Sequence, residues 1–553
     1  MRIRDSGIGV GGPGGRAVCC LFAVLLLLAT GAVRGDQRGW LELVSHSHTF
    51  MFAPGNAASY PVAISANGRY VAFYSYATDL IDGGSDTNGT ADAFLWDGDT
   101  RTVTLISHQA GSATTTGNSG SYPVAMSWDG RYVAFGSQAT DLIAGGTDTN
   151  GSPDAFLWDR VTGEVSLISH TASSSKVAAN GYSMPTAIDK DGRYVTFFST
   201  GGNLISGQIT AAGEHAFVWD RVSEEVRLVS HVPGSDKRTG NKRSVPSAIS
   251  PDGLYVTFLS AATDLIAGGV DTNDREDAFL FVASSGEVRL VSHVPGAPKT
   301  AGNGLSIPLA ISGEGRYVLF YSEAANLIDG GVDTNAAADA FLWDKDTDTT
   351  TLISHKATSA STAGNGRSYP IGMSGDGRYV AYESKATDLI AGGVDTNLAE
   401  DVFLWDRDTP DVRLVSHVPG QPSRAGSGRS RPTAIRRDGA LVAFESTATD
   451  LIAGGTDLNH SDDAFLWERG TGEVRLISHV QQSPLVTSNG RSTPVAISMQ
   501  GIRVAVLSNA TNLFTWFPMN GMEQAFRYEL GLLSDGFESG SFDSYWTYAS
   551  TAS

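Results

Sequence analysis

The sequence predicts an all-β fold, an eight-bladed β-propeller with four antiparallel strands in each blade. Three observations predict it. A segment of about 62 residues occurs eight times and fills almost the whole chain. Each copy divides into four short apolar runs separated by turn residues, without helical periodicity. The two most constant motifs of the repeat are also out of phase at the chain ends, which is typical of a closed ring.

The first copy, residues 60–108, illustrates the four predicted strands. Its apolar runs are 61–65, 69–75, 92–97 and 103–108. Asn67-Gly68 separates the first two runs, and five other copies have Asp-Gly there, a strong hairpin signal. A longer loop leads to the third run, and a short turn leads to the fourth. A four-stranded meander repeated at this period is typical of a propeller blade.

The ends of the chain predict how the ring closes. The tetrapeptide Leu-Ile/Val-Ser-His ends the predicted fourth strands, at His46, His108, His170, His231, His293, His355, His417 and His479. His46 precedes the first Ala-Phe-Leu-Trp motif, whereas the last Phe of that series, Phe526, has no such His after it. We therefore expect residues 40–46 to supply the fourth strand of the eighth blade.

Two residue types support the assignment of strands within a blade. Proline opens each predicted first strand, as at Pro61, and proline is tolerated at the first residue of a strand or on an edge strand. The innermost strand of a blade is such an edge. The Trp of the third strand, such as Trp96, is expected to pack between blades.

The first 35 residues have the features of a secretory signal peptide. Arginines precede an apolar run over residues 17–29, and small residues offer a cleavage point near 32–35. The run is too short for a stable membrane span. We therefore expect a signal peptide over 1–35, a propeller over 39–528 and a short tail over 529–553 that serves for sorting or surface attachment. The protein is expected to be exported, to the periplasm, the cell surface or the medium.

The positions of the cysteines and the net charge indicate how the mature chain is stabilised and which partners its surface repels. The two cysteines, Cys19 and Cys20, lie in the predicted leader, so packing and strand pairing must stabilise the mature chain. The formal net charge is −20, and removal of the leader, with four Arg and one Asp, brings it to −23. Such a surface repels nucleic acid and anionic membranes, and it also keeps an exported protein soluble. We expect a monomer.

The stretch from the first strand to the second resembles a known repeat. The pattern Pro-x-Ala-Ile-Ser-x-Asp-Gly-Arg-Tyr-Val-Ala-Phe-x-Ser is clearest at residues 123–137 and 370–384. It resembles the WD40-like repeat, or PD40, of TolB-type propellers, over about residues 40–528. The resemblance implies the propeller fold. It implies no single activity, because that family includes periplasmic scaffolds and propellers attached to peptidases.

The loop between the second and third strands carries a candidate calcium site, Asp-x-Asn-x-x-x-Asp. The spacing matches positions 1, 3 and 7 of a calcium loop, although the acid at position 12, Asp97, lies ~16 Å further along an extended strand. Calcium binding would therefore be weak. The triplets are Asp86, Asn88 and Asp92; Asp148, Asn150 and Asp154; Asp271, Asn273 and Asp277; Asp333, Asn335 and Asp339; Asp395, Asn397 and Asp401; and Asp457, Asn459 and Asp463.

The same residues also have a purely structural interpretation. Asp and Asn side chains bond their own backbone in turns, so a long hairpin loop selects them anyway. The third and eighth copies lack the triplet and keep the blade, which favours an optional role such as ion binding. The eight histidines are interpreted as structural, because His231 and His46 persist beside copies without a triplet.

Three functions fit the sequence. The first is a non-catalytic propeller that binds a protein or polysaccharide partner through its loop face or central channel. The second is a hydrolase or lyase with a site in the channel, for which only Asp189 and Arg436 stand out among the first strands. The third is a structural, surface-displayed protein. No catalytic residue is assigned, because no nucleophile elbow, phosphate loop, zinc motif or cysteine cluster is present.

Overall fold

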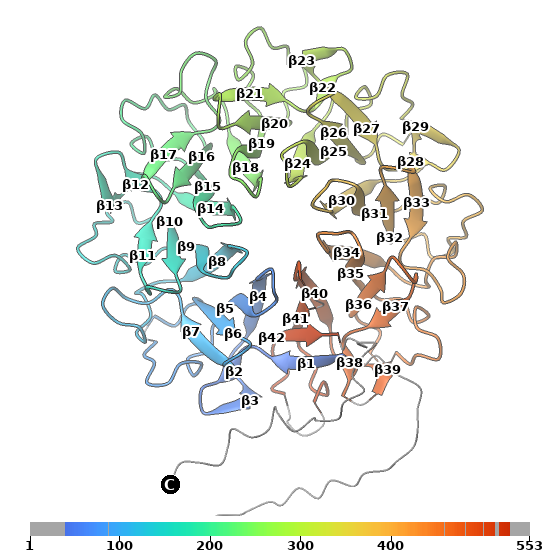
Figure 1. The fold of residues 1–553 in the computed structure, drawn as a ribbon, viewed down its shortest axis with the longest axis horizontal. Helices are drawn as coiled ribbons and strands as arrows, with labels where there is room; N and C mark the ends of the chain where they lie inside the picture. Colours follow the sequence, from blue (N-terminus) through green and yellow to red (C-terminus); the bar gives the residue numbers. More distant parts are fainter. Residues whose placement is uncertain are drawn as a thin grey trace, which may run out of the picture. The chain divides into compact units, whose positions relative to one another are not determined.

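The protein is described from a computed structural model, which covers residues 39–530 except 87, 334, 458, 482, 501–502 and 515–518. The predicted signal peptide and most of the predicted tail lie outside the described residues. Within the described part of the chain all regular structure is β-strand. Eight four-stranded sheets are arranged in a ring, which is the predicted eight-bladed propeller (Figure 1).

Each blade is an antiparallel meander whose first strand is innermost (Figure 1). The first strands are β4 (Ser59–Ile64), β8 (Ser121–Met126), β14 (Ser183–Ile188), β18 (Ser244–Ile249), β24 (Ser306–Ile311), β30 (Ser368–Met373), β34 (Ser430–Ile435) and β40 (Ser492–Ile497). The second strands are β5 (Tyr70–Ser75), β9 (Tyr132–Ser137), β15 (Tyr194–Ser199), β19 (Tyr255–Ser260), β25 (Tyr317–Ser322), β31 (Tyr379–Ser384), β35 (Leu441–Ser446) and β41 (Arg503–Ser508).

The third and fourth strands complete the blades. The third strands are β6 (Asp92–Asp97), β10 (Asp154–Asp159), β16 (His215–Asp220), β20 (Asp277–Val282), β26 (Asp339–Asp344), β32 (Asp401–Asp406), β36 (Asp463–Glu468) and β42 (Gln524–Glu529). The fourth strands are β7 (Thr102–Leu105), β11 (Val165–Leu167), β17 (Glu225–Leu228), β21 (Glu287–Leu290), β27 (Thr349–Leu352), β33 (Asp411–Leu414), β37 (Val474–Leu476) and β1 (Trp40–Leu43). Blade 1 is β4 to β7, and the blades are numbered along the chain.

The ring closes as the motif offset predicts. Strand β1 pairs antiparallel with β42, so that Trp40 lies opposite Glu529 and Leu43 lies opposite Phe526. Blade 8 therefore has the order β1-β42-β41-β40, with its outer strand taken from the start of the propeller (Figure 1). The first and last segments share one sheet, which ties the two ends of the ring together.

The inner strands differ from the prediction at their starts. Each begins two residues before the proline, so that Ser59 opens β4 and Pro61 is its third residue. Proline is tolerated at this interior position because β4 is an edge strand, and the pairing of β4 with β5 is irregular between Pro61 and Ala63.

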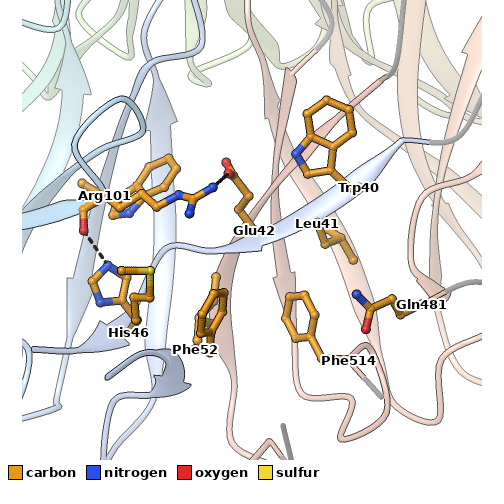
Figure 2. A pocket seen from close by; sticks show the side chains of 11 residues that line it. Trp40, Leu41, Glu42, His46, Phe52, Arg101, Gln481 and Phe514 are labelled. Atoms are coloured by element: carbon orange, nitrogen blue, oxygen red, sulfur yellow. Dashed lines mark hydrogen bonds and ion pairs between the residues drawn. The ribbon is translucent and has the colours of Figure 1, made fainter. Parts of the chain in front are cut away.

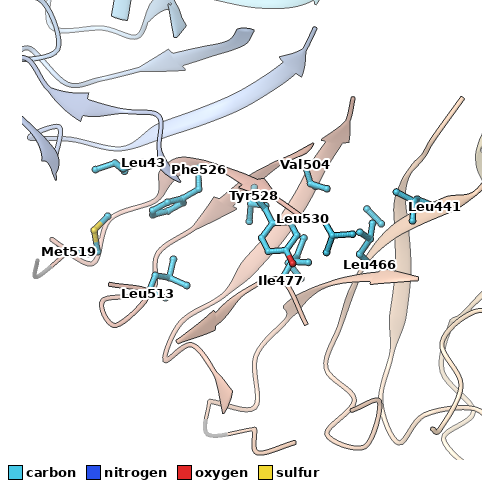
Figure 3. Close-up of a cluster of buried hydrophobic side chains, with 14 residues drawn as sticks. Leu43, Leu441, Leu466, Ile477, Val504, Leu513, Met519, Phe526, Tyr528 and Leu530 are labelled. Atoms are coloured by element: carbon cyan, nitrogen blue, oxygen red, sulfur yellow. The ribbon is translucent and has the colours of Figure 1, made fainter. Parts of the chain in front are cut away.

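Hydrophobic cores lie between neighbouring blades. Trp96 of blade 1 is buried against Ala505 and Ala525 of blade 8, as expected for a residue that packs between blades. The seam between blades 7 and 8 contains Leu466, Val504 and Phe526 in one cluster, to which Leu43 of β1 also belongs (Figure 3). Because each core is built from two blades, no blade buries its faces alone.

The fourth strands are shorter than predicted, because they end at the Leu three residues before the His. In five copies the His instead opens a short outer ribbon that connects one blade to the next. These ribbons are β2 (His46–Ser47) with β3 (Phe50–Pro54), β12 (His170–Thr171) with β13 (Ser174–Ala178), β22 (His293–Val294) with β23 (Ala297–Ala301), β28 (His355–Lys356) with β29 (Ser359–Ala363), and β38 (His479–Val480) with β39 (Ser483–Thr487).

Candidate functional site

Two sets of loops share one face of the propeller, here called the loop face. They are the loops between second and third strands and the loops between one blade's fourth strand and the next blade's first. In the first copy, Ser85 N–H donates to Thr114 O over 3.0 Å, and Asn88 Nδ2 donates to Gly117 O over 2.7 Å. Direct hydrogen bonds between the two loop sets therefore hold the loop face together.

The three members of each acidic triplet have different roles in the loop. Asp86 Oδ1 accepts the N–H of Asn88 over 3.1 Å, as in an Asx turn. The Asn amide then reaches the following connecting loop. Asp92 lies at the base of the loop, where its Oδ1 accepts the hydroxyl of Ser107 over 3.0 Å. The equivalent Asn bonds to the connecting loop are made by Asn150, Asn273, Asn335, Asn397 and Asn459.

The third aspartate of each triplet is buried, and its carboxyl lies near a second carboxyl. Burial raises the pKa of Asp92 to about 7; the nearby Asp86 carboxylate raises it further, and the Ser107 hydrogen bond opposes the shift. The same causes raise the pKa of the equivalent carboxyls to about 7 at Asp154, Asp339 and Asp401, and to about 8 at Asp277 and Asp463. Each loop therefore places a poorly compensated carboxyl next to a second one.

The donor set fits a calcium ion only in part. Asp86, Asn88 and Asp92 supply hard oxygen ligands, whereas Asp97 is bound at the far end of β6 by a bidentate ion pair with Arg69. In the described part of the chain no group of three or more His, Cys, Asp or Glu side chains is placed to hold a metal ion. Calcium binding by the triplets stays a prediction.

The copies without a triplet have a neutral or buried polar residue in place of the third aspartate. In blade 8, Gln524 Oε1 accepts the Ser45 hydroxyl over 2.7 Å, as Asp92 accepts that of Ser107. In blade 3, His215 is fully buried, its Nε2 lies 3.0 Å from Ala211 O, and burial lowers its pKa. The fold therefore needs a polar group at this position and not a charge.

The histidines connect neighbouring blades. His46 Nε2 lies 3.0 Å from Arg101 O, in the outer turn of the next blade, and its Nδ1 lies 3.1 Å from Ser47 O (Figure 2). In His46 both ring nitrogens therefore lie against backbone carbonyls, whereas His355 Nε2 is buried without a partner. The equivalent Nε2 contacts join His108 to Gly163, His170 to Glu224 and His417 to Gly472, while His293 contacts the Asp348 side chain.

An apolar cavity of about 260 Å³ lies beside the closing strand β1. Trp40, Phe52 and Phe514 contribute to its lining (Figure 2). Glu42 borders the cavity and forms ion pairs with Arg101 and Arg527. This cavity lies at the outer rim, among the elements that close the ring.

On the opposite face, here called the turn face, backbone hydrogen bonds join the turns between first and second strands around the axis. Ala66 N–H donates to Trp128 O over 2.8 Å, and Trp128 N–H donates to Lys190 O over 3.0 Å, so adjacent inner turns are joined. The guanidinium of Arg437, from blade 7, lies 4.2 Å from the ring centre of Trp128, from blade 2. Arg437 therefore reaches across the ring and stabilises this end of it.

The other polar residues singled out in the sequence have structural partners. Asp189 is buried and accepts the N–H of Tyr194 over 2.8 Å, and Arg436 forms a bidentate pair with Asp438. In the basic run before β18, Lys242 pairs with Asp274 and Arg243 pairs with Glu214 over 2.7 Å. None of these contacts defines an active site.

The axial end of the loop face breaks the symmetry of the ring. Here the fifth residue of each second strand is adjacent to the second residue of the next blade's first strand, and these positions are called the axial ring. Aromatic pairs occupy two seams, Tyr74 with Tyr122 at 5.3 Å and Tyr321 with Tyr369 at 5.2 Å between ring centres. Glutamates replace the aromatic residues at two other seams.

These glutamates are functional candidates that the sequence interpretation missed. Glu383 Oε2 lies 3.5 Å from Arg431 Nε of blade 7. Glu445 is buried, and its Oε2 accepts the Thr493 hydroxyl over 2.7 Å from blade 8. The signal was present in the sequence, because other second strands have Tyr, Phe, Leu or Gly at this position.

Tyr60 and Tyr76 extend the pair of Tyr74 and Tyr122 into a larger tyrosine group on blades 1 and 2. Tyr60 stacks on Tyr74 at 4.8 Å, and Tyr76 packs edge-on against Tyr74 at 6.4 Å. A hydrogen bond to Glu523, together with burial, raises the pKa of Tyr60 to about 12. Tyr76 and Tyr122 are 44% and 39% exposed. One arc of the axial ring is therefore aromatic, and another arc is charged.

Comparisons with known proteins show no family for this chain. No protein-family model and no curated protein matches the chain. A prolyl endopeptidase structure is 12% identical, with a TM-score of 0.44 over 85% of this chain and 55% of that chain. The putative TolB from Agrobacterium tumefaciens is 15% identical, with a TM-score of 0.29 over 67% and 96% of the two chains. The WD40 domain of SCAP from fission yeast is 10% identical, with a TM-score of 0.37 over 89% and 98%.

These likenesses concern the fold. The chain spans about half the length of the prolyl endopeptidase that it matches. Over the described residues, no helix is long and apolar enough to cross a membrane. The blades and their closure define the chain as an eight-bladed β-propeller.

Proposed function

We propose that the protein is an exported, non-catalytic propeller of the TolB-type PD40 class that binds a polysaccharide or protein partner at the axial ring. The observation that carries this proposal is the asymmetry of the ring. Eight near-identical blades place exposed tyrosines at one arc and paired charges at another. A ring built for packing alone would repeat one residue type at every seam.

A polysaccharide fits the tyrosine arc better than a folded partner. Tyr60, Tyr74, Tyr76 and Tyr122 form one contiguous group, in which Tyr76 and Tyr122 are exposed and the other two are partly exposed. Flat aromatic faces pack against the C–H faces of sugar rings, and the phenol hydroxyls bond to sugar hydroxyls. Rigid aromatic side chains also lose little conformational entropy on binding.

Binding to an oligosaccharide array tests the proposal. We expect the protein without its leader to bind at least one polysaccharide class, and Tyr122→Ala to weaken that binding about tenfold or more. The matched control is Val161→Ala, because Val161 is 63% exposed on an outer turn, away from the axis. If Tyr122→Ala binds as tightly as the unchanged protein, the axial ring is not the binding site.

A second candidate function is a hydrolase or lyase at the same ring. It is favoured by Glu383, whose pKa is raised by burial although the Arg431 charge opposes the shift. A buried carboxyl of raised pKa is suited to general acid catalysis. Loss of polysaccharide chain length on incubation, abolished in Glu383→Gln, would support the enzyme. Unchanged chain length in the presence of binding supports the non-catalytic function.

Calcium is proposed as a weak ligand of the acidic loops, which would stabilise the loop face around the ring. The adjacent carboxyls of Asp86 and Asp92 support this proposal, because a divalent cation would offset the repulsion that raises the pKa of Asp92. We also propose that the protein acts as a monomer outside the cytoplasm, where millimolar calcium is available. A structural role in surface display is the alternative if no ligand is found.

A further inference from the structure

Arg431 is the cation that interrupts the axial ring. It is the second residue of β34, and the equivalent positions of the other first strands hold tyrosine, methionine, valine, isoleucine or threonine. Its side chain is 40% exposed. Arg431 is therefore the guanidinium among the axial ring positions, and Tyr369 holds the equivalent position on the neighbouring inner strand β30.

The neutralisation of Arg431 is incomplete. Its contact with a carboxylate is the 3.5 Å approach of Nε to Glu383 Oε2, and Nε is buried without a hydrogen-bond partner. A guanidinium offers five N–H donors in a planar fork that matches a carboxylate. Arg431 therefore has donors available for an anionic group.

Nearby cations are already paired. Arg429 Nη2 donates to Asp462 over 2.7 Å, and Arg491 donates to Glu445 over 3.3 Å. Arg367 and Lys385 share Glu400, with 3.6 Å from Lys385 Nζ to its Oε1. Glu445 lies opposite Arg431 in the pairing of β34 with β35, and its carboxylate is shared with Arg491 and Thr493. Among the described residues, Glu383 is the carboxylate in ion-pair contact with Arg431.

We propose that Arg431 binds the carboxylate of an acidic sugar residue in the polysaccharide whose other rings pack on the axial tyrosines. This inference rests on the proposed polysaccharide-binding function and names its ligand class as uronate-containing chains. The Arg367 guanidinium lies 5.8 Å from the ring centre of Tyr369, so a sugar would pack beside this ring and present its carboxylate to Arg431 on the neighbouring strand. Arg431 gives the preference for acidic over neutral sugars, and the axial tyrosines bind the sugar rings.

The overall charge of the protein makes this selection local. With a net charge of −20 the surface repels polyanions at long range. Binding should therefore need direct contact with Arg431, and it should weaken with added salt.

Calorimetric titration with defined oligosaccharides tests the inference. The probes are oligogalacturonate, alginate oligosaccharides and hyaluronan oligosaccharides, with carboxyl-reduced oligogalacturonate as the neutral counterpart of the same length and linkage. We expect at least one acidic probe to bind tenfold or more tightly than the reduced chain. Arg431→Gln should remove that preference, and Arg431→Lys should retain part of it.

The control variant is Arg238→Gln, which removes an equal charge from an exposed position on the loop face. It should keep the preference for acidic chains, and thermal unfolding should show that both glutamine variants are folded. Equal binding of acidic and reduced chains, or an unchanged preference in Arg431→Gln, overturns the carboxylate subsite and leaves polysaccharide binding intact. If none of these probes binds, the carboxylate subsite is overturned, and the oligosaccharide array decides separately whether the polysaccharide function stands.

Discussion

Glu383 and Arg431 face each other across the seam between blades 6 and 7, with 3.5 Å between Oε2 and Nε. At the equivalent positions of the first seam, Tyr74 and Tyr122 pack ring against ring. The backbone positions are the same, so the difference comes from the side chains alone. The symmetric fold thus serves as a scaffold on which a few substitutions at the axial ring create a binding surface.

The first prediction concerns the pH dependence of ligand binding. Burial raises the pKa of Glu383 above its ordinary value of 4.5. Below the raised pKa the carboxyl is neutral, and above it the carboxylate competes for Arg431 and repels an acidic sugar. Affinity for oligogalacturonate, measured by calorimetry, should therefore fall as the pH rises above 4.5. Glu383→Gln should flatten the profile, and an equally steep profile in that variant would contradict this role.

The second prediction concerns the buried aspartates and the stability of the ring. Folding raises the pKa of Asp92 from 3.8 to about 7, so its stabilising contribution is full below pH 3.8 and is lost as the pH rises to 7. The loss is on the order of 1–4 kcal/mol for each such group. Denaturant unfolding in chelator should show stability declining from pH 4 to 8. Carboxyls that pair with arginine, such as Asp97, have a lowered pKa, so their contribution to stability is lost only as the pH falls below 3.8.

Calcium should counteract that decline. At pH 8, millimolar calcium is expected to raise the unfolding midpoint, because the cation compensates the ionised carboxyls. Asp92→Asn keeps the hydrogen-bond acceptor for Ser107 and removes the charge, so it should stabilise the protein at pH 8 and reduce the calcium effect. A midpoint that does not move with calcium would remove the metal interpretation of the loops.

The third prediction concerns the closing seam. Arg527 is 4% exposed, pairs with Glu42 and donates to Gly68 O over 2.9 Å, whereas blade 1 has Leu95 and Thr104 at these two positions. Glu42→Thr leaves the buried Arg527 charge with Glu529 as its remaining carboxylate partner, at 3.6 Å, and should cost up to about 3–5 kcal/mol. The double variant with Arg527→Leu restores the blade 1 pair and should recover most of that loss.

Chemical denaturation of the two single variants and the double variant measures this coupling. Additive losses would show that the ion pair does not join the ends of the ring.

The fourth prediction concerns the histidines between blades. His170 and His355 are each 7% exposed, but His170 Nε2 contacts Glu224 O at 3.1 Å and His355 Nε2 has no partner. Replacement of His170 by Ala should therefore cost about 1 kcal/mol more than replacement of His355 by Ala. Thermal unfolding of the two variants measures this difference. Equal losses of stability would show that the histidines contribute by packing and not through the Nε2 contact.

Periodicity in the sequence predicted the features that depend on repetition. The motif offset predicted that residues 40–46 complete the last blade, of which 40–43 form β1, and the position of Trp96 predicted packing between blades. The start of each inner strand and the end of each fourth strand were predicted less well. The edge position of β4 lets pairing extend beyond Pro61, and the turn after Leu105 releases His108 toward the next blade, a contact that depends on the spacing of blades.

The candidate site depends on exceptions to the repeat. Comparison of the eight first strands singles out Asp189 and Arg436, which the structure places in turns with local partners. The informative position is the fifth residue of the second strand, where Glu383 and Glu445 replace aromatic or aliphatic residues. Its pairing with the next blade's first strand becomes evident only once the ring is assembled.

A crystal structure of the protein with the tightest-binding oligosaccharide from the titrations would show directly where the ligand binds. We expect sugar rings on the axial tyrosines and a carboxylate within hydrogen-bond distance of the Arg431 guanidinium. A ligand bound instead at the turn face or in the cavity beside β1, with the axial ring empty, would contradict this expectation.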